Sequence, residues 1–226
     1  MSGPGVCVIM VAVLDQIARG HLVSRGHIPP ARPGAGSLHT SVLTAQVQYN
    51  LAHARSYFAE HLAVGDYYSQ GQSVRGEWAG DGARRLGLAG GVQAEAFLRL
   101  CDNQHPATGH TLTQRLNTMR HDGDRAVANR RIFFDFTFSP PKSVSLAAFL
   151  TPDARIPGAH ERAVRVALGE LERFAAVRVR KDGARNARHS GNVITALFTH
   201  ETSRALDPHL HTHAIVFNAS WDPVEA

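Results

Sequence analysis

The stretch "HETSRALDPHLHTHAIVFN", His200 to Asn218, holds four histidines, and two of them, His211 and His213, form a His-x-His pair. The pair lies in "LHTHAIVFN", whose apolar and β-branched residues predict a strand. Successive side chains of a strand point to opposite faces, so residues two apart share a face about 7 Å from one another. Two imidazoles at that separation can converge on one ion.

A second predicted strand, "NVITALFTH", ends at His200, and the polar turn over residues 201–208 joins the two strands. A connection this short favours an antiparallel pair, which would bring His200 beside His211 and His213. Three neutral imidazoles leave coordination positions open for water or substrate, as in catalytic metal sites. His209 is expected to face the opposite side. The alternative for the whole set is that these are ordinary surface or core histidines.

A further strand is predicted over "RIFFDFTFSPP", residues 131–141, which the two prolines end. Alternation divides its side chains between two faces, with Ile132, Phe134, Phe136 and Phe138 on one and Phe133, Asp135 and Thr137 on the other. Asp135 therefore lies opposite a stripe of phenylalanines. Its alternative interpretation is a partly exposed strand residue without a function.

The rest of the chain is divided between helices and loops. Helices are predicted over 44–63, 92–103 and 159–180, with another beginning at Lys142, and loops over 65–91 and 180–188. Strands separated by helices indicate an α/β or α+β sandwich, and the short connection between the last two strands favours antiparallel pairing. The fold class predicted is therefore α+β.

Composition bounds the function less tightly than the motifs do. The chain has 226 residues, enough for one domain, and its 24 Lys and Arg against 19 Asp and Glu permit a polyanionic partner without requiring one. Two cysteines without a C-x-x-C motif favour a reducing, cytoplasmic setting. The nine apolar residues Val6–Leu14 fall short of the roughly 20 that span a bilayer, so no membrane insertion is expected.

The N-terminal 40 residues differ in character from the rest. They are rich in Gly, Pro and Arg and show no periodicity. Residues 1–40 are therefore predicted to be a poorly ordered extension, or to arise from an upstream start codon. The globular domain is predicted over residues 41–226.

All four tyrosines, Tyr49, Tyr57, Tyr67 and Tyr68, lie in one short span of the N-terminal part. The unperturbed pKa of a tyrosine is near 10, so the hydroxyl is a poor nucleophile alone. A cation that polarises a phosphate, together with a nearby carboxylate, could activate it. The alternative is that the aromatic rings only pack at a helix end.

Three segments join these signals: "SYFAEHLAVGDYYSQGQSVRGEWAGDGARRLGL", "FDFTFSPPKSVSL" and "THETSRALDPHLHTHAIVFN". In this order, and over about residues 41–221, they resemble the relaxase domain of conjugative plasmids, the MobF (TrwC/TraI-like) class of HUH endonucleases. The resemblance implies the HUH palm fold, a central antiparallel sheet flanked by helices. The site residues it implies are metal ligands His200, His211 and His213, catalytic residues Tyr57, Tyr67, Tyr68 and Asp135, and DNA contacts Lys142 and Arg204.

The same resemblance implies an activity. Such enzymes cut one strand at an origin of transfer through tyrosine attack on the scissile phosphate, which leaves a 5′-phosphotyrosine link and a free 3′-hydroxyl. The implied cofactor is a divalent ion, magnesium or manganese, with zinc as the alternative. The implied partners are single-stranded origin-of-transfer DNA, relaxosome accessory proteins and a coupling protein. Lys142 and Arg204 have local alternatives, capping a turn and pairing with an acid.

The chain departs from the family pattern in three places. Phe58 follows Tyr57 where many relatives carry a second tyrosine, and Tyr57 and Tyr67 are ten residues apart, slightly wider than the family spacing. The sequence also ends at Ala226, soon after the histidine strand. We therefore expect a relaxase domain that is incomplete at its C-terminus. The alternatives are a rolling-circle replication initiator, disfavoured because no tyrosine follows His213, a metal-dependent amidohydrolase, and an inactive DNA-binding remnant that uses the basic residues between 178 and 188.

Overall fold

The computed structural model describes residues 42–59, 76–114, 116–122, 125–151, 153–181, 184–203 and 205–224. The N-terminal extension predicted over residues 1–40 lies outside these ranges. So do three of the predicted site residues, Tyr67, Tyr68 and Arg204. No helix in the described ranges is long and apolar enough to cross a membrane.

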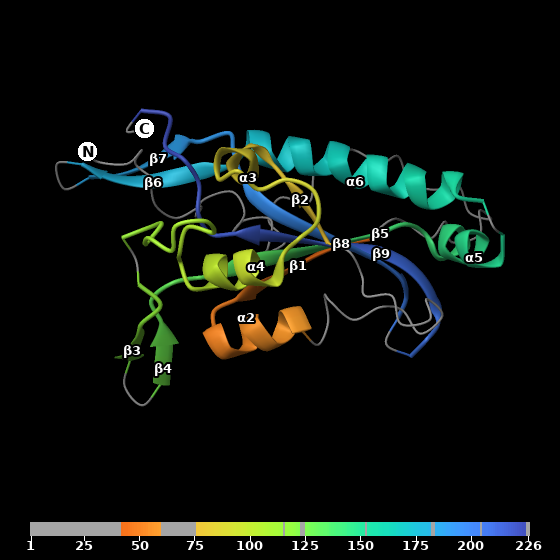
Figure 1. Cartoon of the computed structure of the whole chain (residues 1–226), viewed down its shortest axis with the longest axis horizontal. Helices are drawn as coiled ribbons and strands as arrows, with labels where there is room; N and C mark the ends of the chain where they lie inside the picture. Colours follow the sequence, from red (N-terminus) through yellow and green to blue (C-terminus); the bar gives the residue numbers. More distant parts are fainter. Residues whose placement is uncertain are drawn as a thin grey trace, which may run out of the picture.

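A five-stranded sheet forms the centre of the molecule, in the order β1-β5-β9-β8-β2 (Figure 1). Its strands are β1 (Val42–Gln48), β2 (Glu77–Ala79), β5 (Phe133–Ser139), β8 (Ile194–Thr202) and β9 (Pro208–Phe217). All four neighbouring pairs are antiparallel. The predicted α+β class with a central antiparallel sheet is confirmed, and so is the antiparallel pairing of the last two strands.

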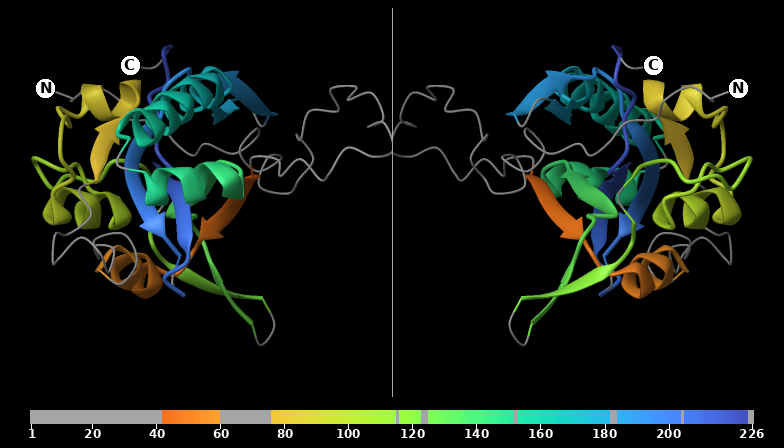
Figure 2. Two further views of the ribbon diagram at one scale, coloured as in Figure 1. Left: turned by 90° about the vertical axis from the view of Figure 1, so that its right-hand side faces the viewer. Right: turned by 90° about the vertical axis from the view of Figure 1, so that its left-hand side faces the viewer.

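Helices cover both faces of this sheet (Figures 1 and 2). α5 (Lys142–Leu150) and α6 (Arg155–Arg173) lie on one side, and α2 (Leu51–Tyr57) and α4 (Ala94–Cys101) lie on the other. The helices predicted over 92–103 and from Lys142 are therefore confirmed as α4 and α5.

The alternation of β5 decides which core each phenylalanine enters. Phe134 and Phe136 pack against the buried apolar residues of α6. Phe133 points to the opposite face, where it packs with Phe97 of α4 at a ring-centroid distance of 6.2 Å. The two-face pattern is confirmed from Phe133 to Phe138, but Ile132 was assigned to the wrong face: it precedes β5 and joins the α4-side core with Phe133. The sheet separates two apolar cores.

The segment predicted as one helix over 44–63 begins instead with a strand. β1 pairs with β5 along its whole length, and α2 starts only at Leu51. Ala45 and Val47 pack against the α6-side core, which follows a period of two rather than a helical period. The backbone groups along this edge of β5 need hydrogen-bonding partners, and pairing with β1 overrides the helical propensity of the segment.

Other boundaries were also wrong. The helix predicted over 159–180 ends at Arg173, because the alternating Val-Arg-Val-Arg that follows forms β6 (Ala176–Lys181). The basic loop predicted over 180–188 is largely β7 (Ala184–His189), paired antiparallel with β6. The loop predicted over 65–91 contains β2 and α3 (Asp81–Arg85).

Two ribbons extend from this body. β6 and β7 form one, next to the C-terminal end of α6 (Figure 1). β3 (Met119–Asp122) and β4 (Arg125–Ala128) form the other, which projects away from the sheet (Figure 2). Both lie apart from the end of the sheet that carries the histidines.

Phe97 is the hub of the α4-side core. It is fully buried, and its ring lies 4.6 Å from that of Phe58, 5.1 Å from Phe217 and 6.1 Å from Phe198. We predict that Phe97→Ala lowers the free energy of unfolding by about 3–5 kcal/mol, because it removes these contacts and leaves a cavity. Denaturant unfolding of the purified chain measures this change.

The matched control for that substitution is Val166→Ala, on α6. Its side chain is 70% exposed, so the change should stay within about 0.5 kcal/mol. A loss below about 1 kcal/mol for Phe97→Ala would contradict the assignment of Phe97 as the core hub.

Candidate metal and tyrosine site

The β8–β9 ladder brings three histidines together at one end of the sheet. His200 and His211 are direct cross-strand partners, and His213 lies two residues along β9 on the same face. The ring centroids are 5.2 Å apart for His200 and His211, 5.6 Å for His200 and His213, and 5.1 Å for His211 and His213. The spatial cluster predicted from the antiparallel return is confirmed.

Hydrogen bonds fix which ring nitrogen two of these histidines present. The Nδ1 of His211 lies 2.8 Å from the carbonyl oxygen of His209. The Nδ1 of His213 lies 3.0 and 2.9 Å from the two carboxylate oxygens of Asp135. These oxygens accept, so Nδ1 carries a hydrogen in each ring, and Nε2 is the nitrogen left to bind an ion. This is how metal-binding imidazoles are usually oriented.

Asp135 joins the histidine strand to a tyrosine. The hydroxyl of Tyr57, the last residue of α2, donates to Oδ2 of Asp135 at 2.6 Å. Asp135 is only 4% exposed, so its carboxylate depends on these partners rather than on water. Tyr57, Asp135 and His213 therefore form one hydrogen-bonded chain across α2, β5 and β9.

Thr137 belongs to the same group and was not predicted. Its hydroxyl lies 3.2 Å from Nδ1 of His213 and 3.5 Å from Oδ1 of Asp135. The signal was present in the sequence, since Thr137 is two residues from Asp135 and so shares its face of β5. Pairing of Thr137 with His213 across the strands then places the hydroxyl at the site.

His209 was placed on the wrong face by the sequence analysis. It lies two residues before His211, so its side chain shares the face of the other histidines. Its ring stacks on that of His211, with centroids 4.6 Å apart and an angle of 18° between the planes. Burial, followed by the positive charge of Lys142 and by His213, lowers the pKa of His209.

Burial also lowers the pKa of His211, to about 4, although its hydrogen bond to the His209 carbonyl acts in the opposite direction. His213, His200 and His209 lower it further, because each would repel a second positive charge. His211 is therefore neutral near neutral pH. The neutral imidazole is the form that binds a metal ion.

The donor set fits a divalent ion by type. Three imidazoles share one face, and two of them present Nε2 through bonds at Nδ1. In the described ranges, however, no group of three or more His, Cys, Asp or Glu side chains is placed so that it could hold a metal ion. The rings of His200 and His211 are stacked, with 21° between their planes.

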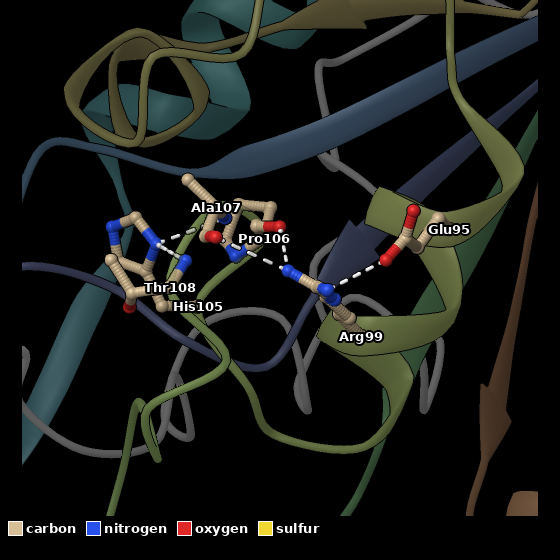
Figure 3. Close-up of polar contacts among 6 residues, drawn as sticks. All are labelled: Glu95, Arg99, His105, Pro106, Ala107 and Thr108. Carbon is tan, nitrogen blue, oxygen red and sulfur yellow. Dashed lines mark hydrogen bonds and ion pairs between the residues drawn. The ribbon is translucent and has the colours of Figure 1, made fainter.

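Not every histidine belongs to this cluster. Figure 3 shows the loop after α4, where Nδ1 of His105 accepts hydrogen bonds from the amides of Ala107 and Thr108, at 3.2 and 3.4 Å. Arg99 of α4 donates to the carbonyl of Pro106 at 2.8 Å and holds the same loop. His105 shapes a turn and leaves that nitrogen no role as a ligand.

The predicted DNA contacts are placed only in part. Lys142 begins α5, and its Nζ donates to the carbonyl of Pro208 at 2.7 Å. In the ribbon of β6 and β7, Arg188 pairs with the fully buried Asp222 at 2.7 Å. This ion pair stabilises the fold, so Arg188 is not an open phosphate contact. Arg204, Tyr67 and Tyr68 lie outside the described residues, and the structure does not place them in the site.

Known proteins resemble this chain both in sequence and in structure. Residues 51–225 match the TrwC relaxase family. The multifunctional conjugation protein TraI of Escherichia coli K12 is 40% identical over 155 residues, which are 69% of this chain and 8% of that protein. The chain therefore spans a small part of this relative.

Solved structures of the conjugative relaxase TrwC are also similar. In its metal-bound complex with oriT DNA, TrwC is 35% identical to this chain with a TM-score of 0.65, over 82% of this chain and 60% of TrwC. A complex with a 27-mer DNA comprising the recognition hairpin and the cleavage site gives 34% identity and a TM-score of 0.63, over 82% of this chain and 58% of that one.

We predict that the imidazole of His211 titrates near pH 4 in the metal-free protein, because burial disfavours its charged form. Side-chain NMR across about pH 3–8 measures the midpoint, and a His211→Gln spectrum assigns the signal. The unfolded chain takes up this proton near pH 6.5. The contribution of His211 to stability is therefore complete above that pH and is lost as the pH falls toward 4. A midpoint near 6.5 would contradict the prediction.

Proposed function

Since this chain belongs to the TrwC relaxase family, we propose that it cuts one strand of DNA at an origin of transfer and transfers that strand during conjugation. The observation that carries the proposal is the hydrogen-bonded chain from Tyr57 through Asp135 to His213, beside His200 and His211. A hydroxyl nucleophile, a carboxylate within hydrogen-bonding distance and a cluster of imidazoles are the parts that phosphoryl transfer to tyrosine needs.

In the proposed reaction, the Oη of Tyr57 attacks the scissile phosphorus and forms a new phosphodiester. The bond from phosphorus to the 3′-oxygen breaks, and that oxygen takes up a proton to become a free 3′-hydroxyl. Asp135 lies 2.6 Å from the attacking hydroxyl, which is within the range for accepting its proton. The product is a 5′-phosphotyrosine link, which conserves the bond for a later rejoining step.

His200, His211 and His213 are proposed to hold one divalent ion. When bound, such an ion neutralises the non-bridging phosphate oxygens as negative charge builds on them. We propose magnesium or manganese, with zinc as the alternative, because nitrogen ligands prefer the later metals by affinity while availability in the cell favours the former. Asp135 contributes by holding the ring of His213 rather than by sitting among the three imidazoles.

The remaining assignments rest on the sequence and on the relatives. Tyr67 and Tyr68 are proposed to serve a second strand transfer, which follows the one made by Tyr57. Lys142 and Arg204 are proposed to contact DNA phosphates; an ammonium has three donors, so the bond of Lys142 to Pro208 leaves two.

The setting of the reaction follows from the substrate. The partners proposed are single-stranded origin-of-transfer DNA, relaxosome accessory proteins and a coupling protein. Because the substrate is plasmid DNA, we propose that the chain acts in the cytoplasm. We also propose that residues 41–226 are the relaxase unit, preceded by a separate extension.

We predict a covalent adduct between the chain and single-stranded DNA. The purified protein is mixed with manganese or magnesium and with oligonucleotides that carry an origin of transfer, labelled at the 3′ end, and run on a denaturing gel. The 3′ fragment should migrate slowly, because its 5′ phosphate is linked to protein. With the label at the 5′ end, the product should instead be a shorter free strand.

Substitutions assign the adduct. Tyr57→Phe removes the proposed first nucleophile and should abolish it, whereas Tyr67→Phe and Tyr68→Phe should leave the first cut in place. His211→Ala should abolish the adduct with either metal. Retained DNA binding with no adduct under any of these conditions would favour the inactive DNA-binding remnant over the enzyme.

We predict that Asp135→Asn slows adduct formation by about 100-fold, since the amide accepts a proton poorly and no longer favours the Nδ1–H form of His213. Manganese affinity should fall by about tenfold for the second reason. Gel time courses and calorimetric titration measure the two effects. Asp153→Asn is the matched control, because among the described residues that side chain bonds to Arg155, in a surface segment before α6. An unchanged rate for Asp135→Asn would remove Asp135 from the proposed mechanism.

A further inference from the structure

One edge of the histidine strand extends past the end of its neighbour. β5 pairs with β9 from Phe133 opposite Phe217 to Phe138 opposite Thr212. Residues Pro208–His211 of β9 lie beyond the last of these pairs. On this edge the described residues offer no β5 partner to the strand that carries His209 and His211, so the backbone needs other hydrogen-bonding groups.

Helix α5 supplies those groups. The Oγ of Ser145 accepts a hydrogen bond from the amide of Leu210 at 3.1 Å, and Nζ of Lys142 donates to the carbonyl of Pro208 at 2.7 Å. Ser145 and Leu210 are each 1% exposed, so water does not compete for this contact. Both groups come from the segment "PKSVS", in which the proposed reaction gives a role to Lys142 but none to Ser145.

The amide that Ser145 receives belongs to the His209–Leu210 peptide. The carbonyl of that same peptide is the acceptor for Nδ1 of His211, at 2.8 Å. Because a peptide is planar, fixing the direction of its N–H also fixes the direction of its C=O. The hydroxyl of Ser145 and the ring of His211 are therefore coupled through one rigid unit.

The adjoining even-numbered position is held in a related way. The hydroxyl of Thr212 lies 2.9 Å from Nε2 of the buried His160 of α6 and 2.8 Å from the hydroxyl of Thr199. Polar contacts thus hold Pro208, Leu210 and Thr212, the three positions that alternate with the histidines. The odd positions are left to form the site.

We propose that Ser145 is a positioning residue that holds His211 in the Nδ1–H tautomer with Nε2 directed at the proposed ion. The proposal rests on the proposed function in one respect, which is that His211 is a metal ligand. Without Ser145, the buried amide of Leu210 loses its acceptor, and the peptide is free to turn toward another one. The carbonyl would then no longer orient the ring.

The first test follows the tautomer in the metal-free protein. Side-chain ¹⁵N NMR of His211 should report one Nδ1–H form in the wild type and a mixture of both tautomers in Ser145→Ala. Ser143→Ala is the matched control, an exposed serine of the same segment, and should give the wild-type spectrum. A single Nδ1–H form in folded Ser145→Ala would overturn the proposal.

The second test measures manganese affinity by calorimetric titration of the full chain. Ser145→Ala should bind about tenfold more weakly than the wild type, the lower end of the range for groups that orient a ligand. Ser145→Cys keeps the size of the side chain with a weaker acceptor, and it should fall between the two. If melting of the metal-free proteins shows that Ser145→Ala does not fold, Ser145→Cys takes its place in both tests. Equal affinity of the folded variant and the wild type would overturn the proposal.

Failure of the proposed function has a different signature. His211→Ala should bind no manganese at this site. If it binds like the wild type, or if the wild type binds none, the metal assignment is wrong whatever Ser145 does. The tautomer measurement needs no metal, so it still decides whether Ser145 orients His211.

Discussion

The buried carboxylate of Asp135 is the constraint on which the site depends. A carboxylate that is 4% exposed is costly unless it is hydrogen-bonded, so its neighbours must supply donors. Tyr57 and His213 do so, and they come from elements that are far apart in the sequence. Satisfying this one side chain therefore fixes the end of α2 against the centre of the sheet.

One face of the sheet carries a continuous apolar core, and the other face carries the candidate site. On the α6 side, Phe134 and Phe136 join a continuous apolar core that anchors the central strands. On the α4 side the core around Phe97 covers only part of the face, and the polar site occupies the histidine end of the strands. Because both lie on a single sheet, packing on one face keeps the histidines on the other face in register.

The sequence was most informative where local pattern and tertiary context agree. β5, β8, β9 and α4 were predictable because their apolar patterns match the faces they bury. α5 was predicted only from its start at Lys142, since its buried residue is Ser145 rather than an apolar stripe. The cluster of His200, His211 and His213 followed from one antiparallel turn. Tyr57 and Asp135 came from the resemblance to relaxases, since no spacing rule links residues 78 positions apart.

What escaped prediction depends on pairings that no local window contains. β1 was mistaken for helix because its strand character comes from β5, about 90 residues later in the chain. The contact of Ser145 with Leu210 could not be predicted from the sequence, because it depends on where the pairing of β5 with β9 stops. His209 is a different case, since simple alternation would have placed it correctly beside His211.

The charges of the proposed site explain why the carboxylate of Asp135 contacts His213 rather than the proposed ion. Three neutral imidazoles would leave a divalent ion its full charge, whereas a carboxylate among them would cancel part of it. Asp135 instead contacts Nδ1 of His213, on the far side of that ring from Nε2. In the proposed reaction its negative charge attracts the proton of Tyr57, while the positive charge of the proposed ion stays available for a phosphate. The same side chain can thus assist the nucleophile without weakening the electrophilic side of the site.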